Sequence, residues 1–395
     1  MEQTAATHTF SSKTNRPASP LVLVTHEFFP HRGGIAVYAA EMARAAKSLG
    51  YEVEVWAPAL PPGVKEPAWP FPVRRLPLAG DHGLLSQWRM ARQLLAQRDR
   101  LREATLYIPE PGPLLAMLLL QYFDTLQPNR LLLTLHGSEI HRLASRRLLR
   151  WSTTHLLQKT TRVSVVSAFA RDLFIRYFPE STAKIALTPG ALRTDLLFDS
   201  SPAARTGNRI VILTVARINP RKGQLQVIAA LKMLPAEQRS VIEYRLVGAH
   251  SKENYDAALA AAAASADFPV RFLGDVPDEN LGDVYRQADI FAMTSMPHKQ
   301  SVEGFGLVYL EAGAHGLPVV AHAIGGVPEA ITHGENGLLV APGDLAALTA
   351  AFSRLIADPV LRRQLGAGGR VRSMRNTWRD SAESLFGQPD FPSAS

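Results

Sequence analysis

Two glutamates, Glu303 and Glu311, flank a glycine-rich turn in the most distinctive segment of the sequence. The turn consists of Gly304, Phe305 and Gly306, and the apolar run that follows it is typical of a helix. Free N–H groups at a helix start attract phosphate, and glycine lets a ligand approach the backbone. Seven residues separate the glutamates, so we expect both carboxylates on one side of that helix. Carboxylates are unusual in an otherwise apolar helix, and sugar hydroxyls are suitable partners for them.

A basic loop follows the strand expected at Ile210–Val215. Arg217 and Lys222 would project from this loop at the edge of a sheet, where guanidinium and ammonium groups can grip a diphosphate. Taken alone, the loop could equally be a solvated basic segment. Its combination with the glutamate turn favours a phosphorylated ligand.

Two weaker signals follow strands in the first half of the chain. Gly33 and Gly34 come after the first strand and open a helix, so an anion could approach the N–H groups there, although a glycine pair also suits a plain turn. His136 stands where another strand ends and a glycine follows. A single histidine can be functional or structural, and its spacing does not decide between them.

The composition excludes several kinds of chemistry. No cysteine occurs in the 395 residues, which excludes disulfide frameworks, thiolate zinc sites and cysteine nucleophiles. No two aspartates are spaced by one residue, and the zinc-protease spacing His-Glu-x-x-His is absent. We therefore expect no cofactor and no metal, with phosphate charge neutralised by basic side chains and helix starts.

The residues above need a scaffold that brings loops together, and the alternation of strands and helices predicts one. The strands expected in the first half are Leu21–Thr25, Val53–Trp56, Val73–Leu76, Thr105–Ile108, Leu131–Leu135, Val163–Val166 and Lys184–Leu187. Those expected in the second half are Ile210–Val215, Tyr244–Val247, Val270–Leu273, Ile290–Met293 and Val319–Ala321. This pattern indicates α/β architecture with two doubly wound, Rossmann-like domains. Ligands bind such sheets beyond the carboxyl ends of the strands, here in a cleft between the domains.

We expect a linker at 199–208, which is rich in Ser, Pro and Gly and poor in apolar residues. The N-terminal domain then spans 20–198, after a disordered polar tail at 1–19. The C-terminal domain spans 209–372, and 373–395 form a crossover helix and tail.

The motifs taken together resemble the family-4 retaining glycosyltransferases, which have the GT-B fold. The resemblance spans about residues 20 to 385 and rests on Gly33-Gly34, His136, Arg217 with Lys222, the Glu303/Glu311 pair and the loop Gly325–Glu329. Two positions depart from the family pattern. Thr188–Arg193 lacks the Asn that often precedes its glycine, and Glu139 stands where Asp is frequent. Both lie toward the hinge or the acceptor side, so they bear on acceptor identity.

The resemblance implies that the N-terminal domain lies on the acceptor side and that the C-terminal domain binds the nucleotide sugar. It also implies a role for each donor-site residue. Glu311 would bind the ribose hydroxyls, and the backbone amides of Gly306 and Leu307 would bind the diphosphate. Arg217 and Lys222 would neutralise the leaving phosphates, and Val276 would contact the base through its backbone. Gly304, Phe305, Gly33 and Gly34 complete the donor-binding set. His136 and Glu303, the catalytic residues, would hold the donor sugar's hydroxyls near the reacting carbon.

The predicted function is retaining transfer of a hexose from a UDP- or GDP-sugar to a glycan, a lipid-linked or a small-molecule acceptor. A GT-B sugar phosphorylase or a nucleotide-sugar epimerase is the enzymatic alternative. A dehydrogenase is disfavoured because Tyr309 stands where the third glycine of a dinucleotide fingerprint would be. A basic nucleic-acid-binding protein rests on charge alone, without a recognition motif, so we expect no nucleic acid partner.

The net charge of +8 and the pI near 9.8 indicate acidic partners. No acidic residue occurs between Ile140 and Arg162, and on a continuous helix Arg142, Arg146 and Arg150 would share one face. Ile140, Ala144, Leu148 and Trp151 would form the opposite, apolar face. The basic face is either solvated or rests on anionic lipid, and the lipid-linked acceptors of the family favour lipid. With no secretory signal and no apolar span, we expect a cytoplasmic protein, peripheral on the inner membrane face.

Overall fold

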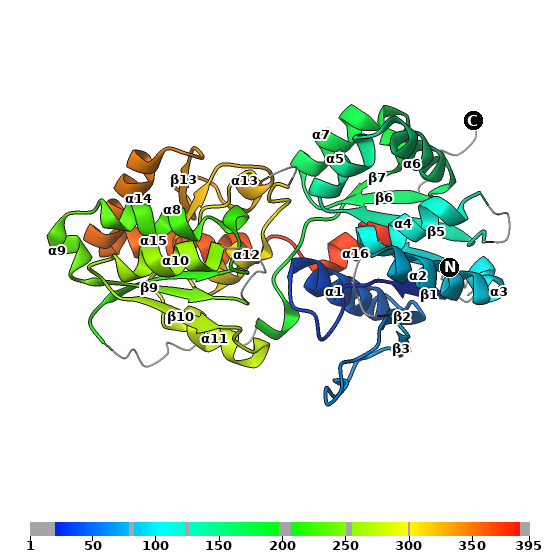
Figure 1. Ribbon diagram of the computed structural model, residues 1–395, viewed down its shortest axis with the longest axis horizontal. Helices are drawn as coiled ribbons and strands as arrows, with labels where there is room; N and C mark the ends of the chain where they lie inside the picture. Colours follow the sequence, from blue (N-terminus) through cyan, green and yellow to red (C-terminus); the bar gives the residue numbers. More distant parts are fainter. Residues whose placement is uncertain are drawn as a thin grey trace, which may run out of the picture.

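Two lobes make up the computed structural model, which describes residues 20–78, 83–122, 126–196, 207–249, 255–298 and 301–387. Each lobe contains one parallel sheet with helices on both of its faces (Figure 1). The predicted pair of doubly wound domains is therefore confirmed. The expected tail at 1–19 and all but the last two residues of the expected linker at 199–208 lie outside the described residues.

The N-terminal domain is built on a seven-stranded sheet in the order β3-β2-β1-β4-β5-β6-β7. Its strands are β1 (Leu21–Val24), β2 (Val53–Pro58), β3 (Val73–Leu76), β4 (Thr105–Ile108), β5 (Arg130–Leu135), β6 (Arg162–Val165) and β7 (Ile185–Leu187). All four residues of β1 are buried, because helices cover both sides of this central strand. Leu21 and Leu23 belong to one apolar cluster, whereas Val22 and Val24 belong to another, as the two-residue period of a strand requires.

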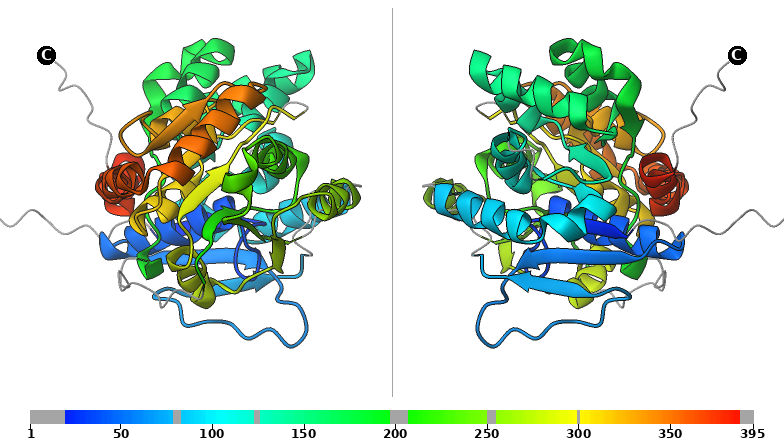
Figure 2. Two further views of the ribbon diagram at one scale, coloured as in Figure 1. Left: turned by 90° about the vertical axis from the view of Figure 1, so that its left-hand side faces the viewer. Right: turned by 90° about the vertical axis from the view of Figure 1, so that its right-hand side faces the viewer.

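Two sets of helices supply those clusters. The first cluster includes α1 (Gly34–Ser48) and the last helix, α16 (Trp378–Phe386), which lie side by side (Figure 2). The second includes α2 (Leu84–Ala96), α4 (Pro111–Leu120), α5 (Ser138–Ala144), α6 (Arg147–Lys159) and α7 (Ala168–Tyr177). Two shorter helices, α3 (Arg98–Glu103) and the 3₁₀ segment Pro179–Lys184, connect the remaining elements.

The C-terminal domain contains a six-stranded sheet in the order β10-β9-β8-β11-β12-β13. Its strands are β8 (Ile210–Val215), β9 (Ile242–Val247), β10 (Val270–Gly274), β11 (Ile290–Met293), β12 (Val319–His322) and β13 (Gly337–Val340). The flanking helices are α8 (Gln224–Lys232), α9 (Ala236–Arg239), α10 (Tyr255–Ala264), α11 (Asp278–Arg286), α12 (Leu307–Ala314), α13 (Val327–Ala330), α14 (Leu345–Ala357) and α15 (Pro359–Ser373). The side that carries α11, α12 and α13 shares one apolar cluster with α1 and α16 of the other domain. The two domains are thus joined by continuous packing.

The chain crosses back to the N-terminal domain through α16. Trp378 donates its ring N–H to the carbonyl of Leu192 at 2.9 Å, and the Ser381 hydroxyl donates to the carbonyl of Pro189 at 2.8 Å. At the other end of the helix, Tyr51 donates to the carbonyl of Phe386 at 2.8 Å. These bonds attach the C-terminal helix to the domain that the chain left at the linker.

The predicted amphipathic helix from Ile140 to Trp151 is wrong. α5 ends at Ala144, and the backbone of Arg146 is extended before α6 begins. Arg142 and Arg150 therefore lie on different helices and do not form one helix face with Arg146. Leu148 and Trp151, expected in the apolar face, are 76% and 60% exposed. The Trp151 ring instead stacks on Tyr122 at 5.9 Å between ring centroids. This surface therefore combines exposed apolar side chains with arginines.

Candidate active site at the domain boundary

Glu303 lies in the loop between β11 and α12, surrounded by donors. Its Oε2 accepts from Lys222 Nζ at 2.7 Å, from Arg221 Nη1 at 3.2 Å and from Ser295 Oγ at 3.1 Å. Burial acts to raise the pKa of this carboxyl, but the positive charges of Lys222 and Arg221 outweigh it and lower the pKa to about 2. Glu303 therefore stays ionised across the pH range in which proteins are handled.

The cations come from the short 3₁₀ turn Pro220–Lys222 that follows β8. Asn219 begins this turn, and its side chain accepts from the backbone N–H of Arg221. The Lys222 side chain is only 14% exposed, and burial lowers its pKa although Glu303 opposes that effect. Sequence analysis named Lys222 but missed Arg221; the Asn-Pro pair at the start of the turn was the available signal.

Arg217 differs from Lys222. Its side chain is exposed, and it forms no ion pair within the part of the chain that the structure describes. The backbone carbonyl of Arg217 accepts from Gln224, which fixes the loop without engaging the guanidinium. The predicted basic pair thus separates into a buried lysine that contacts Glu303 and an arginine open to solvent.

The helix after the turn begins at Leu307, four residues beyond Glu303. The prediction that both glutamates share one helix face is therefore wrong, since Glu303 is not helical, and neither carboxylate is unpaired. Gly306 has a φ of 88°, and a Cβ there would come within 2.5 Å of the Tyr309 ring, so only glycine fits. No side chain caps α12 and no acidic residue lies in its first turn, which leaves its first N–H groups available.

His136 of the other domain lies directly against the same turn. A Cβ on Gly304 would come within 1.9 Å of the His136 carbonyl oxygen, so the two backbones touch here. The His136 ring bonds through Nε2 to the carbonyl of Pro109 at 2.8 Å, and its backbone N–H donates to Glu139. The predicted catalytic residues, His136 and Glu303, are thus brought together from different domains, and buried Phe305 follows them.

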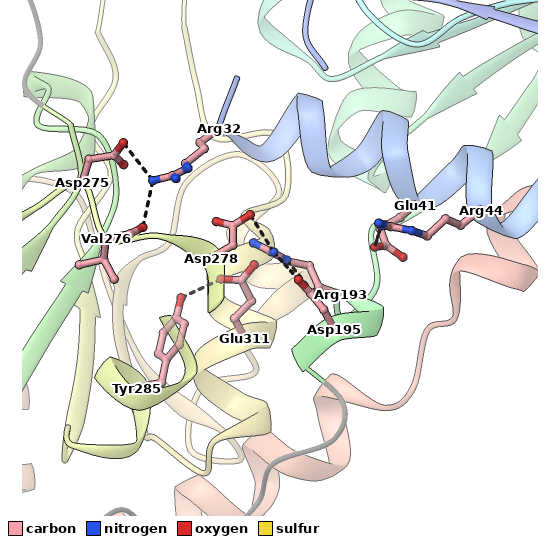
Figure 3. A network of polar contacts seen from close by, with 10 residues as sticks. All are labelled: Arg32, Glu41, Arg44, Arg193, Asp195, Asp275, Val276, Asp278, Tyr285 and Glu311. Carbon is pink, nitrogen blue, oxygen red and sulfur yellow. Dashed lines mark hydrogen bonds and ion pairs between the residues drawn. The ribbon is translucent and has the colours of Figure 1, made fainter. Parts of the chain in front are cut away.

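Glu311 occupies a second polar cluster, drawn in Figure 3. Tyr285 donates its hydroxyl to Oε2 of Glu311 at 2.8 Å, and burial raises the pKa of the carboxyl although the charge of Arg193 opposes this. Arg193 is 9% exposed and pairs with Asp195 at 2.6 Å and Asp278 at 2.9 Å. Sequence analysis assigned no role to Arg193 because its partners lie in both domains.

Val276, the residue expected to contact the nucleotide base, lies at the edge of this cluster. Arg32 donates to the Val276 carbonyl at 3.3 Å and to Asp275 Oδ2 at 3.1 Å, reaching across from the loop before α1 (Figure 3). Gly33 and Gly34 follow, and a Cβ on either would meet no atom within 4 Å. Like α12, α1 begins without a side-chain cap or an acidic first turn. The domain boundary therefore presents two open helix starts.

No three His, Asp or Glu side chains gather into a metal-binding group within the described ranges. The charged groups of this boundary are instead arginine, lysine and carboxylate side chains. Such a set can bind a diphosphate and the hydroxyls of a sugar.

Comparison with known proteins shows which family this chain belongs to. Residues 32–196 match the model described as Glycosyltransferase Family 4, and residues 198–372 match Glycosyl transferases group 1. A GDP-mannose-dependent alpha-(1-6)-phosphatidylinositol monomannoside mannosyltransferase from Mycolicibacterium smegmatis is 30% identical over 92% of this chain and 97% of that relative. The chain belongs to glycosyltransferase family 4. Its predicted reaction class, glycosyl transfer, is thereby confirmed.

One further relative and two solved structures are also similar to this chain. A D-inositol 3-phosphate glycosyltransferase from Acidothermus cellulolyticus is 30% identical, covering 90% of this chain and 85% of the relative. The fold matches sucrose-phosphate synthase from Thermosynechococcus elongatus with a TM-score of 0.74, 21% identity, and coverage of 93% and 97%. It also matches WaaG, a glycosyltransferase involved in lipopolysaccharide biosynthesis, with a TM-score of 0.72, 15% identity, and coverage of 93% and 100%. These likenesses confirm the GT-B fold.

Proposed function

We propose that this family 4 glycosyltransferase transfers mannose from GDP-mannose, with retention and without a metal ion, to an inositol-containing or other lipid-linked acceptor. The observation that carries the proposal is the open start of α12, which lies between the Glu303–Lys222 pair and Glu311. The choice of donor is supported by relatives such as the M. smegmatis enzyme, whose name specifies GDP-mannose.

In this account the diphosphate binds at the start of α12, where Gly306 and Leu307 present backbone N–H groups. Arg217 is exposed and makes no competing ion pair among the described residues, so its guanidinium can turn to the phosphates. Lys222 lies next to Glu303 and adds a second positive charge. The open start of α1 at Gly33 and Gly34 faces the same boundary from the other domain.

Departure of the nucleoside diphosphate builds negative charge on the leaving oxygen and positive charge on the sugar ring. Lys222, Arg217 and the helix starts stabilise the negative charge, which is the task that a metal ion performs in other enzymes. Glu303 is held by three donors and has a pKa of about 2, so it suits the binding of sugar hydroxyls better than nucleophilic attack. In this proposal the acceptor hydroxyl attacks on the face from which the diphosphate leaves and passes its proton to the departing phosphate oxygen. The configuration is then retained without a covalent intermediate on Glu303.

The remaining donor contacts follow from the second cluster. Glu311 accepts hydrogen bonds from the ribose hydroxyls, and Tyr285 already holds one of its oxygens in place. The Val276 carbonyl contacts the base after Arg32 releases it. His136 holds the donor sugar from the N-terminal side, with its ring fixed by the Pro109 carbonyl.

The acceptor side is supported by an exposed surface formed just after α4 and at the start of α6, which we name the aromatic-basic patch. It consists of Tyr122, Leu148, Trp151, Arg146, Arg147 and Arg150. Aromatic and leucine side chains enter the headgroup region of a bilayer, and each arginine near anionic lipid contributes about 1 kcal/mol. Among the described residues, no helix is long and apolar enough to cross a bilayer. Peripheral attachment through this patch would bring a lipid-linked acceptor to the enzyme.

The proposal is tested with a donor panel and with vesicles. GDP-mannose should support sugar transfer to phosphoinositide-containing vesicles in EDTA, whereas UDP-glucose should not. Replacing Arg146, Arg147 and Arg150 by Glu should reduce co-sedimentation with anionic vesicles. The same charge change at exposed Arg354 and Arg363 of the other domain, and at exposed Arg375 just after it, is the control. Equal, weak binding of neutral and anionic vesicles would exclude the membrane part, and strict preference for a UDP-sugar would exclude the donor part.

A further inference from the structure

A carboxylate of the C-terminal domain binds the start of a helix in the N-terminal domain. Glu329 of α13 accepts the backbone N–H of Ala168 at 2.7 Å through Oε2 and that of Phe169 at 2.9 Å through Oε1. These amides open α7, and Figure 1 shows α13 at the rim of its domain that faces α7. About 160 residues separate the partners along the chain, so the contact depends on how the two domains are placed against each other.

The two hydrogen bonds that Glu329 accepts complete the capping of α7. Ser167 caps this helix by accepting from the N–H of Ala170 at 3.1 Å, and no acidic residue of α7 itself lies in the first turn. Glu329 therefore supplies the negative charge and the two acceptors that the helix start lacks. This contrasts with α1 and α12, whose starts carry no side-chain cap.

The loop that carries Glu329 also contacts the backbone of Glu303 and Gly304. The N–H of Gly326 donates to the Glu303 carbonyl at 3.0 Å. A Cβ on Gly326 would lie 1.9 Å from the Gly304 carbonyl oxygen and 3.2 Å from the Ser167 Cβ. Since Gly304 in turn touches the His136 carbonyl, one continuous series of contacts runs from α7 through Glu329 to both proposed catalytic residues.

We propose that Glu329 is a positioning residue, whose contact with the first turn of α7 sets the placement of His136 relative to Glu303 across the domain boundary. The inference rests on the proposed catalytic roles of His136 and Glu303. Glu329 itself touches neither donor nor acceptor in this account; its carboxylate acts through the loop from Gly325 and through α7. A misplacement of about 1 Å between reacting groups lowers a rate by about 10²-fold, so loss of this contact acts on the transfer step.

The test compares Glu329→Ala and Glu329→Gln with the control Glu335→Gln. Glu335 is exposed, lies six residues further along the same domain and makes no side-chain bond to α7, so the control matches the change in charge. Three quantities are measured: kcat with GDP-mannose, the dissociation constant for GDP, and amide hydrogen exchange in the first turn of α7. Thermal melts establish that each variant is folded.

Glu329→Ala should lower kcat by about 10- to 100-fold while the GDP dissociation constant changes less than about twofold, because the nucleotide contacts lie elsewhere. Exchange at Ala168 and Phe169 should accelerate, whereas exchange at the start of α1 should not. Glu329→Gln keeps one carbonyl acceptor and should fall between Glu329→Ala and the wild type. The control should match the wild type in all three quantities.

Two results would overturn the inference. Unchanged exchange at Ala168 and Phe169 in Glu329→Ala would mean that the contact does not protect α7 in solution. Accelerated exchange with unchanged kcat would mean that the contact forms without positioning the catalytic residues. Failure of the wild-type enzyme to use any GDP-sugar would instead contradict the proposed donor, and the exchange measurement would still decide whether the contact exists.

Discussion

Glu303 and Glu311 are almost equally buried, at 8% and 4% exposure, yet their surroundings have opposite effects on their charge. Around Glu303, Lys222 and Arg221 lower the pKa to about 2. Around Glu311, burial outweighs the charge of Arg193, Tyr285 supplies a neutral hydrogen bond, and the pKa is raised. Burial alone therefore does not decide whether a carboxylate is ionised; the partner within hydrogen-bond reach does. Glu303 therefore keeps its charge to lower pH than an ordinary glutamate, whereas Glu311 is protonated at higher pH than an ordinary glutamate.

Removing the Glu303 carboxylate should have the largest effect on stability and activity. Glu303→Ala leaves Lys222 buried without its partner, and breaking a buried ion pair in this way typically costs about 3–5 kcal/mol of unfolding free energy. Transfer should fall below detection because the sugar loses a binding carboxylate. Denaturant unfolding and a transfer assay measure the two effects.

The double variant Glu303→Leu with Lys222→Met provides the control for that experiment. It removes both charges, so it should recover most of the stability lost in Glu303→Ala but none of the transfer. A loss of less than about 1 kcal/mol in Glu303→Ala would show that the pair behaves like a surface ion pair.

Low pH should also weaken the contribution of the Glu303 ion pair to the free energy of unfolding. The pKa of Glu303 is lower in the folded protein than its ordinary value near 4.5, so its contribution is present above that value and is lost as the pH falls toward 2. The shift corresponds to about 3 kcal/mol. Unfolding free energies between pH 5 and pH 3 should therefore fall more steeply in the wild type than in Glu303→Gln. Equal slopes would contradict the strong ion pair.

Glu311→Ala should act on donor binding rather than on folding. The ribose hydroxyls lose a charged acceptor, which is worth about 1.5–3 kcal/mol, whereas burial already disfavours the ionised carboxyl, so stability should change little. Calorimetric titration with GDP measures the loss, and Glu237→Ala at an exposed position is the control. Unchanged GDP affinity in a folded Glu311→Ala would remove Glu311 from the donor site.

The smallest effect should be the pH dependence of donor binding. The pKa of Glu311 is raised, so its carboxyl is protonated at a higher pH than an ordinary glutamate, and GDP affinity should weaken there. Arg193, Asp195, Asp278 and Tyr285 face the same carboxyl and are included in that balance. GDP binding across mildly acidic pH should flatten in Glu311→Gln. A profile that is the same in both proteins would assign the titration to another group.

The scaffold was more predictable from the sequence than the contacts that cross it. Apolar runs such as Leu21–Val24 are fully buried and mark strands directly, but β13 was missed because its four residues begin with a glycine. The turn at Gly304–Gly306 was predictable because its two glycines stand out in the sequence, and the structure has room for no other residue at either position. Arg193 and Glu329 could not be assigned from local sequence, since Asp278, one partner of Arg193, and the α7 amides that donate to Glu329 lie in another domain. The break at Arg146 has no Gly or Pro to mark it, so the helix from Ile140 was extended wrongly.

We propose that this enzyme transfers a hexose from a GDP-sugar with retention and without a metal ion. Proton NMR spectroscopy of the product, formed from GDP-mannose and a phosphoinositide acceptor in excess EDTA, tests it most directly. We predict transfer at the same rate with and without EDTA, and a product whose new glycosidic bond keeps the anomeric configuration of the donor. An inverted anomeric signal, or activity that disappears in EDTA and returns with Mn²⁺ or Mg²⁺, would contradict it.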